Sequence, residues 1–288
     1  MADGPQASVR TVAVSWDGAL PKSIGEVDPH RAVLRADEPM AARGAGVFET
    51  LLVREGRACL LDAHLARLAA SAATVGLPAP RDAEVAVTAA LRRWPGGEAM
   101  LRVLYGAGRH GPRGFVTVSA LPARVGDARR DGVAAVTVDR GVPADPPGPW
   151  SVATVKSMSY ALCTAAQQHA RRAGAQDAVL VSSDGYVLEG ARAAVLLVPT
   201  PGELLTIGPA APVLPSITAR ATLIEAARRG WRLRSGPVRV ADLVSAQQVW
   251  LLSSVTLAAR VHTLDGVTLH AGDAGGDVAR LVVEAATA

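Results

Sequence analysis

The chain has 288 residues, of which 49% are hydrophobic and 19% are charged, a composition that suits a folded protein and excludes a disordered one. Its net charge of +4 comes from scattered basic residues and only 3% of residues are aromatic, so a basic groove that stacks nucleic-acid bases is not expected. The apolar runs are too short to span a bilayer, and the first ten residues lack the apolar core of a signal peptide. A cytoplasmic protein that binds neither a membrane nor a nucleic acid is therefore expected.

The first part of the chain alternates strand-like runs with two helix-like runs. The predicted strands are residues 11–15, 46–53, 57–60, 99–105 and 115–120. Gly56 lies in the turn between the second and third of these strands, which favours a hairpin. Asp62 is predicted to cap a helix that ends before Gly76, and a second helix is predicted over residues 82–93.

Residues 121–127 read as a connection between two domains. Beyond them, strands are predicted at residues 133–139, 151–156, 178–182, 193–198, 203–205, 232–239, 248–252 and 261–264. Helices are predicted at residues 160–173, 218–230, 241–246 and 279–286. The pattern indicates an α+β chain with a small domain over residues 1–120 and a larger domain over residues 128–288.

One lysine stands out because the chain uses arginine almost everywhere else. Of the 30 basic residues only Lys22 and Lys156 are lysines, and Lys22 lies in a loop-like stretch between prolines and glycines. Lys156 follows a strand-like run and precedes a helix, where apolar neighbours would lower its pKa and make it a nucleophile. Arginine cannot take this role because its guanidinium stays protonated. From the local pattern alone, a lysine that snorkels at a strand end explains Lys156 equally well.

Four segments, taken together, carry a resemblance to a known family. They are Gly-Val-Phe-Glu-Thr at 46–50 with His-Leu-Ala-Arg-Leu at 64–68, Lys-Ser-Met-Ser-Tyr at 156–160, Asp-Gly-Tyr-Val-Leu-Glu-Gly at 184–190, and Leu-Pro-Ser-Ile-Thr at 214–218 with Leu-Ser-Ser-Val at 252–255. In order and spacing they resemble the fold-type IV pyridoxal-phosphate enzymes, which include branched-chain and D-amino acid aminotransferases and 4-amino-4-deoxychorismate lyase. The resemblance implies a smaller N-terminal α/β domain and a larger C-terminal pseudo-barrel domain.

The resemblance also implies pyridoxal 5′-phosphate as the cofactor, held by Lys156 as a Schiff base. Glu189 would pair with the pyridine nitrogen and keep it protonated, so that the ring can accept electrons. Arg67 matches the phosphate-binding arginine of the family, and the guanidinium fork suits a phosphate. The remaining phosphate contacts are expected from a helix start and from a turn, at Ile217, Thr218, Ser254 and Val255.

Further site residues are expected beside the cofactor. Tyr160 would hydrogen-bond the phenolic oxygen of the cofactor, although the offset of this tyrosine from the lysine varies in the family and a merely packed Tyr160 is an alternative. Substrate contacts are expected from Phe48 and from arginines that suit a dicarboxylate, with surface roles for these arginines left open: Arg102, Arg109 and Arg113. No metal is expected, because Cys59 and Cys163 lack metal-ligand spacing. The resemblance implies a homodimer.

The chain departs from the pattern of the family around the cofactor. The acid of the usual Gly-Asp-Gly is Ala45, the usual Ser-Asn is Ala193-Ala194, and the glycine of Gly-Ile-Thr is Ser216. The usual Ser/Thr-Arg-Gly reads Gly-Ala-Gly at 106–108. These changes leave the cofactor chemistry intact and place the substrate specificity in doubt.

The catalytic residues alone do not separate two reactions. Lys156 would remove the proton beside the substrate nitrogen, after which a transaminase returns it to the cofactor and the lyase expels pyruvate to give 4-aminobenzoate for folate biosynthesis. The sequence of residues 46–60 and 253–262 resembles the aminodeoxychorismate lyase branch, so the lyase is the first hypothesis. The alternatives are a class IV aminotransferase for D-amino acids or branched-chain amino acids, and a non-catalytic pyridoxal-phosphate-binding protein.

Overall fold

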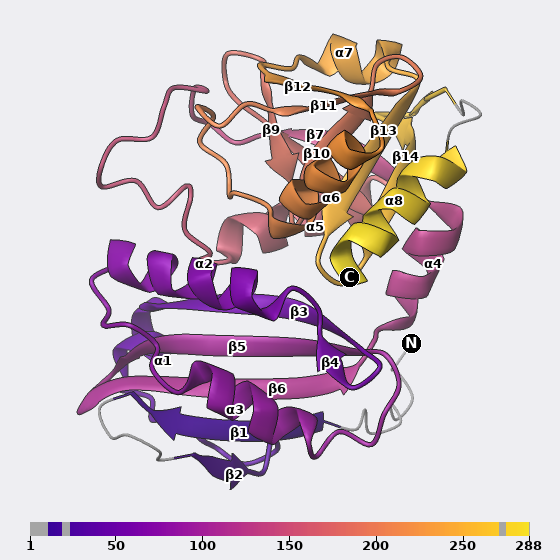
Figure 1. Cartoon of the computed structure of the whole chain (residues 1–288). Coiled ribbons are helices and arrows are strands. Elements are labelled where there is room, and N and C mark those ends of the chain that lie inside the picture. Colours follow the sequence, from indigo (N-terminus) through magenta and orange to yellow (C-terminus); the bar gives the residue numbers. More distant parts are fainter. Residues whose placement is uncertain (1–10, 19–23, 271–274, 288) are drawn as a thin grey trace. The chain divides into compact units, whose positions relative to one another are not determined.

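The computed structural model describes residues 11–18, 24–270 and 275–287, which form two compact units (Figure 1). The first unit contains the described residues up to Pro122 together with the short segment Val155–Ser159. The second unit contains Ala123–Thr154 and the described residues from Tyr160 onward. Lys156 therefore packs with the first unit, whereas the sequence placed it in the C-terminal domain. Lys22 and the first ten residues lie outside the described residues.

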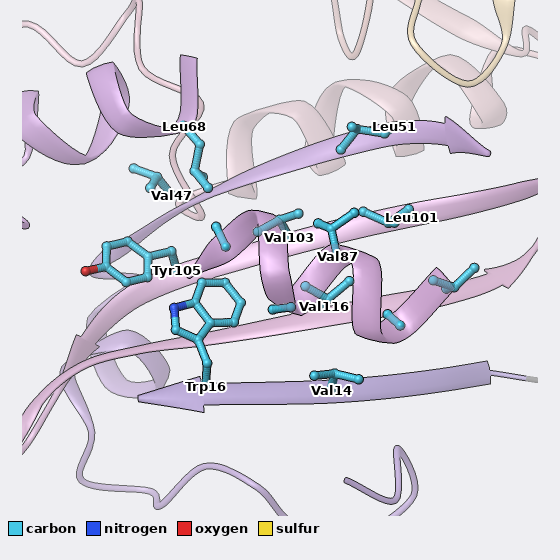
Figure 2. Packing of buried hydrophobic residues seen from close by; sticks show 14 of the residues in the cluster. Val14, Trp16, Val47, Leu51, Leu68, Val87, Leu101, Val103, Tyr105 and Val116 are labelled. Carbon is cyan, nitrogen blue, oxygen red and sulfur yellow. The ribbon is translucent and has the colours of Figure 1, made fainter. Parts of the chain in front are cut away.

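A six-stranded antiparallel sheet forms the first unit, in the order β2-β1-β6-β5-β3-β4. Its strands are β1 (Thr11–Asp17), β2 (Gly25–Val27), β3 (Gly46–Arg54), β4 (Arg57–Ala58), β5 (Ala99–Gly108) and β6 (Gly111–Ala120). The helices are α1 (Pro39–Arg43), α2 (Leu61–Thr74) and α3 (Ala83–Leu91). Alternate residues of the strands, such as Val47, Leu51 and Val103, are fully buried and pack with Leu68 of α2 and Val87 of α3 (Figure 2).

The start of α2 differs from the prediction. Leu60 adopts a left-handed backbone conformation with φ 53° and precedes the first helical residue, so the strand predicted to reach residue 60 ends at Ala58. Asp62 lies inside the first helical turn and is not the cap, although its negative charge still favours the helix N-terminus. The short elements β2 and α1 were not predicted, because neither is long enough to show a hydrophobic period.

The second unit is built on a nine-stranded mixed sheet, in the order β12-β11-β10-β13-β14-β7-β8-β9 with β15 paired to β14. Its strands are β7 (Val133–Asp139), β8 (Asp177–Val181), β9 (Val187–Gly190), β10 (Ala194–Val198), β11 (Glu203–Ile207), β12 (Arg232–Gly236), β13 (Gln248–Ser253), β14 (Leu257–Leu264) and β15 (Val267–Thr268). Its helices are α4 (Ala123–Asp131), α5 (Ala161–Arg172), α6 (Ile217–Arg228), α7 (Val240–Ser245) and α8 (Gly275–Thr287). Both faces of the sheet carry buried apolar residues, and α5 covers one of them.

Three segments of the second unit and its connections differ from the prediction. The connection predicted at residues 121–127 is largely helical, because α4 begins at Ala123 and buries Val125. The strand predicted over residues 151–156 does not form, and this stretch is a loop with turns. Glu189 lies on β9, a strand that was not predicted, which follows the turn at Gly185 with its positive φ of 86°. In the part of the chain that the structure describes, no helix is long and apolar enough to cross a membrane.

Candidate active site

Lys156 lies on a short extended segment that adds to the edge of β3. The Phe48 N–H donates to the Lys156 carbonyl at 2.9 Å, and the Met158 N–H donates to the Gly46 carbonyl at 2.9 Å. These bonds form an isolated antiparallel bridge between β3 and residue 157. On its other side, the Lys156 N–H donates to the hydroxyl of Ser71 in α2 at 3.4 Å. The backbone of Lys156 is therefore held by a strand and a helix of the first unit.

The close approach of this segment to β3 requires glycine at position 46. A Cβ there would lie 2.7 Å from Met158 Sδ and 2.9 Å from the Tyr105 carbonyl oxygen, which belongs to the neighbouring strand β5. The methionine can move, but the carbonyl cannot without disturbing the β3–β5 pairing. We expect Gly46→Ala to lower the free energy of unfolding by about 1–3 kcal/mol, as overpacking does, and to displace the lysine segment.

Thermal and denaturant unfolding measure this loss, with Gly25→Ala as the control. Gly25 lies on β2 of the same unit, and no atom lies within 4 Å of the Cβ that alanine would add. Equal stability and equal activity of the two variants would contradict the close packing of Lys156 against β3.

The Lys156 side chain contacts an aromatic ring. Its Nζ lies 4.6 Å from the centroid of the Phe48 ring, and both residues are half-buried. A ring face attracts an ammonium ion, so Phe48 stabilises the protonated lysine. The structure thus brings together Lys156 and Phe48, both of which were expected at the site from the sequence.

Glu49, the next residue of β3, is the centre of a buried cluster with two residues of α2. Arg67 donates from Nε to Glu49 Oε1 at 2.7 Å and from Nη2 to Oε2 at 2.8 Å. The His64 Nδ1 lies 2.7 Å from Glu49 Oε2. Glu49 is fully buried, and the side chain of His64 is 2% exposed. Glu49 and His64 were part of the motifs at 46–50 and 64–68 but were not predicted as site residues.

The charges of this cluster balance one another. Burial by itself raises the pKa of the Glu49 carboxyl, but the hydrogen bonds from Arg67 and His64 outweigh it and hold the pKa below its ordinary value. Burial lowers the pKa of His64, although Glu49 opposes this shift. At neutral pH the cluster is therefore an ionised carboxylate paired with Arg67 and bonded to a neutral imidazole.

In the second unit, a hydrogen bond joins the Glu189 carboxylate to the segment just before α6. The Leu214 N–H donates to Glu189 Oε2 at 3.3 Å, and the chain reaches the N-cap of α6 two residues later. The cap is Ser216, whose Oγ accepts from the Ala219 N–H at 3.1 Å. Serine at this position, where the family has glycine, is therefore a helix cap. The half-buried Glu189 carboxylate is thus hydrogen-bonded to the segment that leads into α6, and the N-terminus of this helix favours an anion.

The turn that contains Ser254 and Val255 connects β13 to β14. Arg129 of α4 donates from Nη2 to the Val255 carbonyl at 2.6 Å and from Nε to the Thr256 carbonyl at 3.3 Å. The turn ends at Leu257, which has a positive φ of 64°. Arg129 satisfies two carbonyl groups of this turn. This role was not predicted, because Arg129 is one of many arginines in the chain.

Tyr160 immediately precedes the first residue of α5 in the second unit. Burial is the main cause that raises the pKa of its hydroxyl well above the ordinary value, and the neighbouring Cys163 adds to the shift while Arg192 opposes it. The hydroxyl therefore keeps its proton at neutral pH and can donate a hydrogen bond.

The three arginines that were expected to bind substrate lie on β5 and β6 of the first unit or between them. Arg113 Nη1 lies 3.1 Å from Oε1 of Glu38, a residue that is only 3% exposed, and Arg109 forms an ion pair with Asp37. Arg102 is exposed on β5 and lies opposite Thr50, so it shares a face of the sheet with Phe48. The strand register thus places Arg102 and Phe48 on the same face of the sheet, whereas Arg109 and Arg113 pair with acids in the segment before α1.

The structure thus fixes Lys156 against a strand of the first unit and joins Glu189 to the start of a helix in the second unit. The chain matches the class IV aminotransferase family over residues 46–264 and belongs to that family. The predicted family, the two-domain α+β fold and the prediction of an enzyme are thereby confirmed.

Named relatives and a solved structure agree with this assignment. A bifunctional aminodeoxychorismate lyase / D-amino acid transaminase of Mycobacterium tuberculosis is 48% identical over 272 residues, which cover 88% of this chain and 92% of the relative. A chloroplastic D-amino-acid transaminase of Arabidopsis thaliana is 32% identical over 209 residues, covering 68% of this chain and 54% of the relative. The structure of a hypothetical aminotransferase from Mycobacterium tuberculosis in a PLP-bound form is 44% identical, with a TM-score of 0.90, and covers 96% of this chain and 98% of that one.

Proposed function

We propose that the chain is a 4-amino-4-deoxychorismate lyase, which releases pyruvate and 4-aminobenzoate from its substrate. The observation that carries the proposal is the likeness, over nearly the whole chain, to the mycobacterial bifunctional enzyme. Substrates of the class IV family are small amino or keto acids, and the lyase substrate is one of these. The two products together contain all the atoms of the substrate, so the reaction needs no co-reactant.

Pyridoxal phosphate is the cofactor, and when bound it supplies a ring that accepts the electrons of a bond broken beside the substrate nitrogen. Lys156 would be the amine that attaches to it, and Glu189 would be the carboxylate that pairs with its ring nitrogen. Ser216 already accepts the Ala219 N–H, so the phosphate contacts assigned to Ile217 and Thr218 use other N–H groups of the same helical turn. The other phosphate contacts are assigned to Arg67, Ser254 and Val255.

Lys156 also moves the proton on which the reaction depends. With substrate bound, the free Lys156 amine would take the proton from the carbon beside the substrate nitrogen. The Phe48 ring, 4.6 Å from Nζ, stabilises the ammonium that results. The Tyr160 hydroxyl, which keeps its proton, would be able to donate a hydrogen bond to the cofactor.

The arginines provide the contacts for the carboxylates of the substrate. Arg102 is the first candidate, because it shares a sheet face with Phe48 and is exposed. Arg109 and Arg113 would have to leave Asp37 and Glu38, or share the arginine with them, before they bound a substrate carboxylate. The family resemblance leads us to propose a homodimer as the assembly.

A second activity, D-amino acid transamination, is favoured by the names of the bifunctional mycobacterial relative and of the plant relative. The same lysine serves both reactions, which differ in where the proton goes after its removal. Incubation of the purified enzyme with 4-amino-4-deoxychorismate, and separately with D-alanine and 2-oxoglutarate, distinguishes them. We expect 4-aminobenzoate and pyruvate in equal amounts from the first mixture. No product there, together with turnover of D-alanine, would replace the lyase by the transaminase.

A further inference from the structure

The fully buried Glu49 has a position from which it controls the direction of the Arg67 guanidinium. We propose that Glu49 is a positioning residue, which fixes Arg67 so that the rest of its guanidinium binds the phosphate of the cofactor. This inference rests on the proposed function, in which Arg67 is a phosphate ligand. It assigns a role to Glu49, which was not predicted as a site residue.

The geometry of the pair sets the direction of the guanidinium. A guanidinium is planar and carries five N–H bonds, and the contacts with Glu49 use one on Nε and one on Nη2. The edge formed by Nη1 and the second Nη2 hydrogen therefore points away from Glu49. Glu49, whose side chain is not exposed, thus occupies the edge of the guanidinium formed by Nε and Nη2, while the Arg67 side chain is 15% exposed.

His64 keeps the carboxylate in place. A carboxylate only accepts hydrogen bonds, so the Nδ1 of His64 carries the hydrogen and donates it to Glu49. His64 and Arg67 are three residues apart on α2 and therefore lie on the same side of the helix, which places both donors on one carboxylate. Rotation of the unexposed Glu49 side chain would break three hydrogen bonds, so these bonds hold the carboxylate in one orientation.

The same strand and helix hold both Lys156 and Arg67. Phe48 of β3 binds the Lys156 carbonyl through its backbone, and its neighbour Glu49 binds Arg67 through its side chain. On α2, Ser71 lies one turn beyond Arg67 and accepts the N–H of Lys156. Glu49 thus links two residues that are proposed to bind opposite parts of one small molecule, the aldehyde carbon and the phosphate.

The test compares pyridoxal phosphate with pyridoxal, which has the same ring and aldehyde but no phosphate. The dissociation constants of both are measured by spectroscopic titration of the full-length protein freed of cofactor, for the wild type, Glu49→Gln, Arg67→Met and the double variant. We expect Glu49→Gln to weaken pyridoxal phosphate about tenfold or more, because a misdirected fork loses charge-assisted bonds, and to change pyridoxal by less than about twofold. In the Arg67→Met background, Glu49→Gln should add no further loss of phosphate selectivity, since Glu49 acts through Arg67.

The possible results separate this inference from the proposed function. If Arg67→Met loses phosphate selectivity and Glu49→Gln does not, the positioning role is wrong and the function stands. If Arg67→Met leaves the selectivity unchanged, the phosphate role of Arg67 fails and the inference with it. An equal loss of both ligands in Glu49→Gln identifies a merely structural residue and overturns the inference.

Two further variants keep the test decisive. Glu26→Gln removes an exposed ion pair with Arg93 in the same unit and should leave both dissociation constants unchanged. Should Glu49→Gln fail to fold, Glu49→Asp keeps the charge but withdraws it by one methylene, and the same selective loss of pyridoxal phosphate is expected. An Asp variant with unchanged selectivity, or with equal loss of both ligands, would count against the inference in the same way.

Discussion

Lys156→Ala is expected to abolish turnover while the protein stays folded. The amine that attaches to the cofactor and the base that moves the substrate proton are lost together, so kcat should fall by about 10³-fold or more. The fold should be preserved, because the segment is held to β3 and α2 through the backbone of Lys156, which alanine retains. Steady-state kinetics with 4-amino-4-deoxychorismate, alongside thermal unfolding, measures both effects.

The chain offers a matched control for this experiment. Lys22 is its only other lysine, so Lys22→Ala removes the same chemical group elsewhere and should keep full activity. Lys156→Arg is the second comparison, since it keeps the positive charge over Phe48 but cannot attach to an aldehyde. Activity in Lys156→Arg near that of the wild type would show that Lys156 serves only as a charge.

Glu189→Gln is expected to lower kcat by about 10²-fold or more, because the neutral amide cannot stabilise a protonated ring nitrogen and the ring becomes a weaker electron acceptor. Glutamine keeps an oxygen that can accept the Leu214 N–H, so the link to the start of α6 should survive. The loss should therefore appear in kcat and in the absorbance spectrum of the bound cofactor, with little change in the melting temperature.

Glu225→Gln provides the comparison in the same unit. Glu225 of α6 pairs with Arg228 in the same helix and with Arg229, which follows the last residue of the helix. Its substitution removes these ion pairs without touching Glu189. Its activity should equal that of the wild type. Equal kinetics and equal spectra in Glu189→Gln and Glu225→Gln would refute the role of Glu189 at the ring nitrogen.

Much of the fold follows from local patterns in the sequence. The strands β3, β5 and β6 bury alternate residues on the face under α2 and α3. The predicted starts of β3 and β5 were correct, whereas β6 was predicted to its correct end but begins four residues earlier than expected. The segment Val155–Ser159 was predicted to belong to the larger C-terminal domain, but it packs with the first unit. The strand that binds it, β3, lies far away in sequence. Pairing over such a separation depends on tertiary packing, which a local pattern does not encode.

The site residues that could be predicted are those that lie within the family motifs. Lys156 and Phe48 came from the motifs, and the structure brings their side chains into contact. Glu49 could not be recognised as buried from the sequence, since a glutamate in a strand is ordinarily solvated and its partners on α2 follow many residues later. The acids that pair with Arg109 and Arg113 were missed because they lie far from these arginines in the sequence.

The departures from the family pattern now have local explanations at two positions. Ser216 caps α6 and hydrogen-bonds the Ala219 N–H, so the change from glycine adds a contact to the helix start. Ala193 lies in the tight connection from β9 to β10, where its carbonyl accepts the Gly190 N–H at 2.7 Å and its side chain packs on the core of the second unit. Nothing in the structure explains the change from acid to alanine at Ala45.

Reduction with borohydride tests the central claim, that Lys156 carries the cofactor, most directly. The holoenzyme is reduced, digested and analysed by mass spectrometry, with Lys22→Ala treated in parallel. We predict one stable pyridoxyl-phosphate adduct, on the peptide that contains Lys156, in both proteins, and none in Lys156→Ala. An adduct that stays in Lys156→Ala, or a wild-type Lys156 peptide that remains unmodified while the cofactor is bound, would contradict the account.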